Sequence, residues 1–181
     1  PVLWSTVEKT ALADAEVEYL DHTSNTIYVA FKVKETNKDF LKDTNIIIWT
    51  TTPWTIPANK ALAFNSNIEY TILEIDNLEH FKDKRIVVAK NLTESITKAC
   101  EIKSYKELKT FKGSEFTGTI CSHPFLKMDF DYNVPMLDAQ FVNLEQGTGI
   151  VHCAPSHGPD DFNLCINNGI KAIETVDGDG K

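Results

Sequence analysis

The sequence predicts a β-rich α+β domain with a few peripheral helices, and three observations support this prediction. Short β-branched and aromatic runs recur along the chain, prolines and polar clusters separate them, and only a few segments carry helix signals. With 42% hydrophobic and 24% charged residues in 181 positions, the chain can form a packed core. We expect one domain over residues 1–181, excised from a longer protein, because the sequence starts at Pro1 and stops in a polar DGDGK stretch.

The first third of the chain predicts a central strand that ends abruptly. Thr10–Val17 is rich in Ala and Glu and predicts a short helix or the approach to a strand. Ile27–Val33 alternates apolar with other residues, which predicts a half-buried strand in a hairpin with Val17–Leu20. The apolar run Ile46–Trp49 is typical of a central strand, and the prolines of the following TTPWTIP prevent its continuation.

Strands also predominate in the remainder of the chain. A helix is expected at about Leu92–Cys100, and a second one in HGPDDFNLCINNG, where Pro159 opens the first turn and Gly169 terminates the helix. The further expected strands are Ala61–Phe64, Ile68–Ile75, Arg85–Ala89, Gly118–Ser122, Ala139–Leu144 and Ile150–Cys153.

Charge and cysteine content exclude several classes of protein. The net charge of −8 argues against broad contact with a phosphate backbone, so we expect any nucleic-acid contact to be small and local. The four cysteines form no CxxC pair and no dense disulfide pattern, which favours reduced thiols and a cytoplasmic location. No apolar run approaches the roughly 18 residues of a membrane helix, so no membrane partner is expected.

The stretch WTTTPWT (residues 49–55) concentrates hydroxyl groups where the central strand ends. β-Propensity and turn chemistry alone could explain these threonines. The functional interpretation is that hydroxyls and freed backbone groups line a cavity, where they can position an ester and a water without carrying charge.

A second group of residues lies in GTGIVHCAPSHGPDD (residues 147–161). The glycines allow close backbone approach, and His152 follows a short strand. His152 could be a structural histidine, and His157 a loop or capping residue. Asp160 and Asp161 could simply stabilise the start of a helix, but a carboxylate facing a cavity could also hold an ammonium group.

Metal binding and covalent catalysis are both disfavoured. Cys121-Ser122-His123 and His152-Cys153 bring soft ligands together, yet neighbouring strand residues point to opposite faces and no zinc-type spacing recurs. There is no GxSxG elbow, and Ser156 lies in no nucleophile motif.

WTTTPWTIPANKA (residues 49–61), taken with GTGIVHCAPSHGPDDF (residues 147–162), closely resembles the editing (CP1) domain of isoleucyl-tRNA synthetase, a class I aminoacyl-tRNA synthetase. TALADAEVEY (residues 10–19) resembles the start of that insert, so the likeness covers nearly the whole chain. The leucine and valine relatives typically carry Arg after the paired threonines, where this chain has Thr52; Ser156 stands where Gly is common. HIGH and KMSKS are absent, so we expect no aminoacylation by this segment.

The resemblance implies a mixed, β-barrel-like core and a hydrolase for the ester of valine wrongly attached to tRNA(Ile), with valyl-adenylate as a second candidate substrate. It implies no cofactor for editing, entry of the tRNA 3′ end alone, and the remainder of the synthetase acting in cis. By matching motif positions, the implied catalytic residues are Thr50, Thr51, Thr52, His152 and Asp161, and the implied substrate-binding residues are Trp49, Asn59, Thr50, His152 and Asp161.

In this interpretation His152 forms the wall that admits valine and rejects isoleucine, while Asp161 holds the α-ammonium group. Asn59 lies near the terminal adenosine or supports the loop, and His152 acts as a general base or only as a wall. Two alternatives remain: the same fold clearing another amino acid, as in the valyl or leucyl enzymes, and a non-catalytic RNA-binding module.

Overall fold

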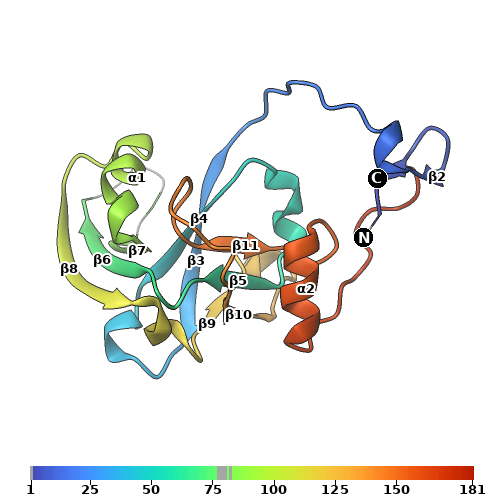
Figure 1. Ribbon diagram of the computed structural model, residues 1–181. Coiled ribbons are helices and arrows are strands. Elements are labelled where there is room, and N and C mark those ends of the chain that lie inside the picture. Colours follow the sequence, from blue (N-terminus) through green and yellow to red (C-terminus); the bar gives the residue numbers. More distant parts are fainter. Residues whose placement is uncertain (1, 77–80, 82) are drawn as a thin grey trace.

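The computed structural model describes residues 2–76, 81 and 83–181 and shows strands with few helices (Figure 1). The strands are β1 (Trp4–Ser5), β2 (Thr10–Ala11), β3 (Ile27–Glu35), β4 (Asn45–Thr50), β5 (Ala61–Phe64), β6 (Glu69–Ile75), β7 (Arg85–Ala89), β8 (Tyr105–Lys112), β9 (Ile120–Ser122), β10 (Asn133–Asp138) and β11 (Val151–Cys153). The α-helices are α1 (Thr93–Ala99) and α2 (Pro159–Asn167). Short 3-10 helices span Asp14–Glu16, Asp39–Leu41, Pro53–Ala58, Lys90–Leu92, Gly113–Phe116 and Leu126–Met128.

Within the described residues, nine strands form one mixed sheet in the order β11-β5-β10-β9-β3-β4-β7-β6-β8. The pairs β4–β7 and β5–β10 are parallel, and the other pairs are antiparallel. β11 also contacts β4, so the sheet curls, but no ladder joins β11 to β8. The β-rich α+β class with a mixed core is therefore confirmed, and the curled sheet does not close into a barrel. β8 is mostly exposed and charged, and β11 is too short to pair along it.

Strand β4 is central because both of its faces are buried. Ile46 and Ile48 pack into the main core cluster, while Ile47 faces a second cluster that includes Ile96 of α1. A third cluster, which includes Cys153 and Cys165, lies between β5, β11 and α2. The continuous β-branched run is thus explained by burial on two sides, as the sequence predicted.

Two of the expected elements are wrong, and the strands β1, β8 and β10 were not anticipated. No hairpin joins residues 17–20 to β3, since β4 and β9 occupy both of its edges and residues 17–26 have no regular structure. The Thr10–Val17 segment, expected as a short helix or the approach to a strand, holds β2 and a short 3-10 helix. Residues 139–144 form turns, and the strand lies just before them as β10. Strand β8, which pairs with β6 at the edge of the sheet, was not anticipated either.

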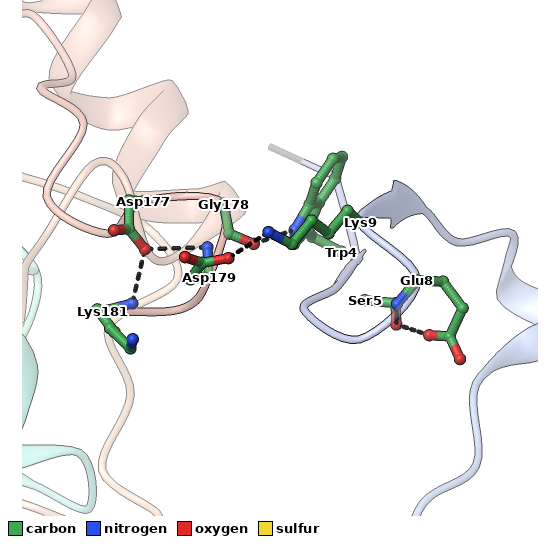
Figure 2. Close-up of polar contacts among 8 residues, drawn as sticks. All are labelled: Trp4, Ser5, Glu8, Lys9, Asp177, Gly178, Asp179 and Lys181. Atoms are coloured by element: carbon green, nitrogen blue, oxygen red, sulfur yellow. Dashed lines mark hydrogen bonds and ion pairs between the residues drawn. The ribbon is translucent and has the colours of Figure 1, made fainter.

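The two ends of the described chain meet beyond α2 (Figure 1). The Trp4 indole N–H donates to the Gly178 carbonyl oxygen at 3.0 Å, and Lys9 pairs with Asp179 at 2.7 Å (Figure 2). An Asp177 carboxylate oxygen accepts from the backbone N–H groups of Asp179 and Lys181, each at 2.9 Å. Because the Lys9–Asp179 pair is exposed, it contributes less than about 1 kcal/mol, so the contact depends mainly on the Trp4 side chain.

Candidate functional site

A cavity of about 360 Å³ opens where β4 ends, beside β11 and the start of α2. This volume lies within the range of small-molecule sites. Its lining consists of Trp49, Thr50, Thr51, Thr52, Trp54, Thr55, Phe141, Asn143, Gln146, Gly147, Thr148, Gly149, Ile150, Val151, His152, Ala154, His157 and Asp161. Residues of both motifs singled out in the sequence therefore line one cavity, although nearly ninety residues separate the motifs.

The threonines of WTTTPWT divide into two groups by their hydrogen bonds. Thr50 is buried, and its Oγ1 accepts the Thr52 backbone N–H at 3.1 Å. The Thr55 hydroxyl donates to the Thr52 carbonyl oxygen at 2.9 Å. Thr51 and Thr52 are exposed; in the described part of the chain, the Thr51 hydroxyl has no protein partner and the Thr52 hydroxyl has only that of Thr50, at 3.3 Å. Thr50 and Thr55 thus hold the loop, while Thr51 and Thr52 can offer hydroxyls to a ligand.

Gly147 and Gly149 shape the turn that precedes β11, because both have positive φ, +79° and +73°. The turn is tied to the sheet by two bonds: the Ala89 N–H donates to the Thr148 carbonyl, and the Tyr70 hydroxyl donates to the Gly149 carbonyl, each at 2.8 Å. A Cβ on Gly149 would lie 2.4 Å from the Ala89 Cβ, a contact that real Cβ atoms do not make. The turn can reach the cavity only because this position is glycine.

Gly149→Ala should lower the free energy of unfolding by about 2–5 kcal/mol, the sum of left-handed strain and the clash with Ala89. Gly169→Ala is the matched control, since its φ is +74° but a Cβ there meets nothing within 4 Å. It should cost only about 1–2 kcal/mol. Urea unfolding of both variants measures the difference, and equal losses would contradict the proposed packing of the turn.

His152 lies on β11, is 8% exposed, and has both ring nitrogens engaged. The Asn59 amide N–H₂ donates to the Ala61 carbonyl at 2.9 Å and lies 3.3 Å from His152 Nδ1. His152 Nε2 lies 3.0 Å from the Thr55 hydroxyl, whose own hydrogen goes to the Thr52 carbonyl oxygen. Both ring nitrogens are hydrogen-bonded when Nδ1 accepts and Nε2–H donates, whereas Asn59 Oδ1 is buried without a partner among the described residues. His152 is therefore a neutral imidazole whose lone pair is directed at Asn59.

Burial of the His152 ring, aided by His157 and His123, lowers its pKa from 6.5 to about 4. Between these pH values the unfolded chain binds the proton that the folded chain rejects, so stability is complete above about pH 6.5 and falls as the pH drops toward 4. Lowering the pH from about 7 to about 5 should therefore reduce the free energy of unfolding by about 2 kcal/mol through His152. Urea titrations at both pH values should show a smaller loss in His152→Gln than in the wild type; an equal loss would contradict the assigned burial.

Asp161 lies in the first turn of α2 and presents a partly buried carboxylate to the cavity. Its Oδ2 accepts the Ala154 backbone N–H at 2.8 Å. Burial raises the pKa of the carboxyl group, and the bond from Ala154 offsets only part of that rise. A desolvated carboxylate favours a cation beside it, so the position suits an ammonium group. Asp160 is exposed and is not part of the cavity lining.

The structure brings together all the predicted site residues except Asn59. That side chain is fully buried behind His152 and does not line the cavity. Of the two roles expected for it, support of the loop fits this position. Trp54, Thr55 and His157 also line the cavity, which was not predicted. Trp54 is 63% exposed, and its ring meets the His157 ring edge-on with the ring centroids 5.0 Å apart. Thr55 could have been found because it is the last hydroxyl of the WTTTPWT stretch that the sequence analysis singled out.

Other site types find little support in the described part of the chain. No group of three or more His, Cys, Asp or Glu side chains there is placed to hold a metal. Likewise, none of the helices over these residues has the length and hydropathy to cross a membrane.

Comparison with known proteins gives one family. The family model described as the editing domain of leucyl-tRNA synthetase matches residues 23–181. An isoleucine–tRNA ligase from Pelagibacter ubique is 71% identical over 181 residues, covering 100% of this chain and 20% of the relative. The corresponding protein of Gluconobacter oxydans is 43% identical over 187 residues, covering 100% and 20%. The chain therefore spans about a fifth of the length of these curated relatives.

Solved structures show the same fold at low sequence identity. The editing domain of the cytosolic leucyl-tRNA synthetase of P. knowlesi superposes with a TM-score of 0.60 at 13% identity, covering 79% of this chain and 60% of that one. The equivalent domain of P. falciparum gives 0.55 at 19% identity, covering 69% and 45%. These likenesses establish the architecture of the sheet and its helices.

Proposed function

Because this chain belongs to the editing-domain family of the aminoacyl-tRNA synthetases, we propose that it hydrolyses the ester of valine mischarged on tRNA(Ile) within an isoleucyl-tRNA synthetase. The observation that carries the proposal is a single cavity that combines the Asp161 carboxylate, the Thr51 and Thr52 hydroxyls and the buried His152 ring. High identity to isoleucine–tRNA ligases supports the choice of tRNA.

Asp161 would bind the α-ammonium group of the aminoacyl ester. Its carboxylate accepts one hydrogen bond from another residue, that of Ala154, so it retains acceptor capacity for the three N–H groups of an ammonium. A charge-assisted bond of this kind contributes about 1.5–3 kcal/mol, enough to fix the orientation of the ester in the cavity.

His152 would limit the size of the amino-acid side chain. Its position is set by hydrogen bonds at both ring nitrogens, and its lone pair is turned to Asn59. Its low pKa, about 4, also leaves the ring neutral near pH 7. These features support a steric wall over a general base, which would need its lone pair directed at a water.

A separate editing pocket is needed because one methylene group changes the binding free energy of an amino acid only slightly. A hydrophobic pocket gains only about 1–3 kcal/mol from an extra methylene, a range known from this class of enzyme. A synthetic site that fits isoleucine therefore accepts some valine, and a smaller hydrolytic pocket removes it.

In the reaction, a water would add to the ester carbonyl carbon, the bond to the ribose oxygen would break, and valine and tRNA with a free terminal hydroxyl would leave. The exposed hydroxyls of Thr51 and Thr52 would orient the water and the ribose, while Thr50 holds the loop. Placing the reactants in this way would accelerate the hydrolysis without a covalent intermediate or a cofactor. Valyl-adenylate, which carries the same ammonium and carbonyl groups, is a second candidate substrate.

The tRNA itself would be held by the rest of the synthetase in the cytoplasm, since this chain is acidic and only the 3′ end need enter. The test is deacylation of Val-tRNA(Ile) and Ile-tRNA(Ile) by the parent synthetase. We expect valine to be released and isoleucine to be retained. Failure to release valine would overturn the proposal, and release of another amino acid instead would assign the cavity to a different editing reaction.

A further inference from the structure

The loop between β9 and β10, residues 123–132, packs against the 3-10 helix Pro53–Ala58 without lining the cavity. His123 is 1% exposed, and its Nε2–H donates to the Ile56 carbonyl oxygen at 2.9 Å. Its Nδ1 accepts the Phe125 backbone N–H at 3.1 Å, which assigns the tautomer. The ring stacks on Phe130 with centroids 4.8 Å apart, so the imidazole is fixed in both position and orientation.

Tyr132 makes the neighbouring contact. Its hydroxyl donates to the Asn59 carbonyl oxygen at 2.6 Å, and the Lys60 ammonium lies 3.9 Å from the centre of its ring. The Tyr132 and His123 rings lie 5.3 Å apart. The two packed side chains, His123 and Tyr132, therefore hold the carbonyl groups of Ile56 and Asn59 near the end of the 3-10 helix.

This helix in turn supplies both side chains that bond to His152. Thr55 lies within it and Asn59 directly follows it. Short 3-10 helices have poor hydrogen-bond geometry of their own, and the residue that precedes this one, Thr52, makes no side-chain capping bond. The position of the His152 ring therefore depends on the residues that hold this 3-10 helix in place.

We propose that Tyr132 and His123 are positioning residues for amino-acid discrimination: they fix the 3-10 helix Pro53–Ala58, and through Thr55 and Asn59 they fix the depth of the His152 wall. The inference rests on the proposed editing function. Discrimination between amino acids that differ by one methylene group requires a rigid pocket wall. The contacts that lead from the Tyr132 and His123 side chains to the His152 imidazole provide this rigidity.

Tyr132→Phe in the parent synthetase is the test, because it removes one hydroxyl and keeps the ring against His123 and Lys60. The measured quantity is the ratio of kcat/KM for Val-tRNA(Ile) to that for Ile-tRNA(Ile). We expect this ratio to fall about two- to tenfold through faster cleavage of isoleucine, the equivalent of one lost hydrogen bond. In a His152→Ala background the same change should leave the ratio unaltered, because the wall it positions is gone.

Thr44→Val is the matched control for a merely structural role. It also removes a hydroxyl that donates to a buried backbone carbonyl, that of Leu41 at 2.6 Å, but before β4 and away from the cavity. It should lower the melting temperature as Tyr132→Phe does and leave the ratio unchanged. An unchanged ratio in Tyr132→Phe, or an equal fall of the ratio in the His152→Ala background, would overturn the positioning role. A wild-type enzyme that does not clear valine would instead overturn the proposed function, and this inference with it.

Discussion

Replacing Asp161 with asparagine in the parent synthetase should lower kcat/KM for clearance of Val-tRNA(Ile) by about 10- to 150-fold, equivalent to one charge-assisted hydrogen bond of about 1.5–3 kcal/mol. The change keeps the size of the side chain and leaves an oxygen to accept the Ala154 N–H. What it removes is the negative charge that would face the α-ammonium group. Single-turnover deacylation with purified Val-tRNA(Ile) measures the loss.

Asp160→Asn is the control for Asp161→Asn because it removes the same charge from the same helical turn. Asp160 is exposed and does not line the cavity, whereas Asp161 does. The control should retain clearance within about twofold, since an exposed charge at a helix start contributes only about 0.3–1 kcal/mol to stability. Equal losses in the two variants would show a general effect of charge and contradict a specific ammonium site.

His152→Ala should make the enzyme cleave Ile-tRNA(Ile), which the wild type spares. Removing the imidazole opens space between Thr55 and the cavity, and the extra methylene of isoleucine then fits. The rate of isoleucine release should rise by about 10- to 200-fold, the discrimination that one methylene provides. Valine clearance should persist, because in this account the imidazole contributes no proton transfer.

The pattern of rates separates the two roles considered for His152. If it were a general base, His152→Ala would reduce clearance of valine and would not create cleavage of isoleucine. His22→Ala, at an exposed position outside the cavity, controls for loss of a histidine and should behave as the wild type. Unchanged valine clearance together with intact isoleucine would contradict the site assignment for this residue.

Much of the fold could be predicted where burial leaves a clear pattern. β5 and β7 have the expected boundaries because all their residues except Arg85 are apolar and buried. β8 was missed because six of its eight residues are exposed at the edge and only its pairing with β6 makes it a strand. β10 was missed because Pro135 lies inside it, paired with Ile120. Both segments are strands because they pair with strands distant in the sequence, and such pairing leaves no pattern in the local sequence.

The site was predicted more completely than the fold, because the motifs carry a family resemblance and lie at strand ends. Trp49, the three following threonines, His152 and Asp161 all line one cavity. Asn59 and Thr55 show what a sequence cannot supply: the tautomer of His152 and the support of its ring depend on hydrogen bonds across the fold. The choice between Thr50 as a loop residue and Thr51 or Thr52 as ligand residues likewise required the three-dimensional hydrogen bonds.

The most direct test is a crystal structure of the parent synthetase with a non-hydrolysable valyl-adenosine analogue of the charged 3′ end. We expect the α-ammonium group within hydrogen-bond distance of an Asp161 carboxylate oxygen, the valine methyl groups against the His152 ring, and the carbonyl beside Thr51 and Thr52. An analogue bound away from these residues, or one whose ammonium group faces solvent, would contradict this expectation.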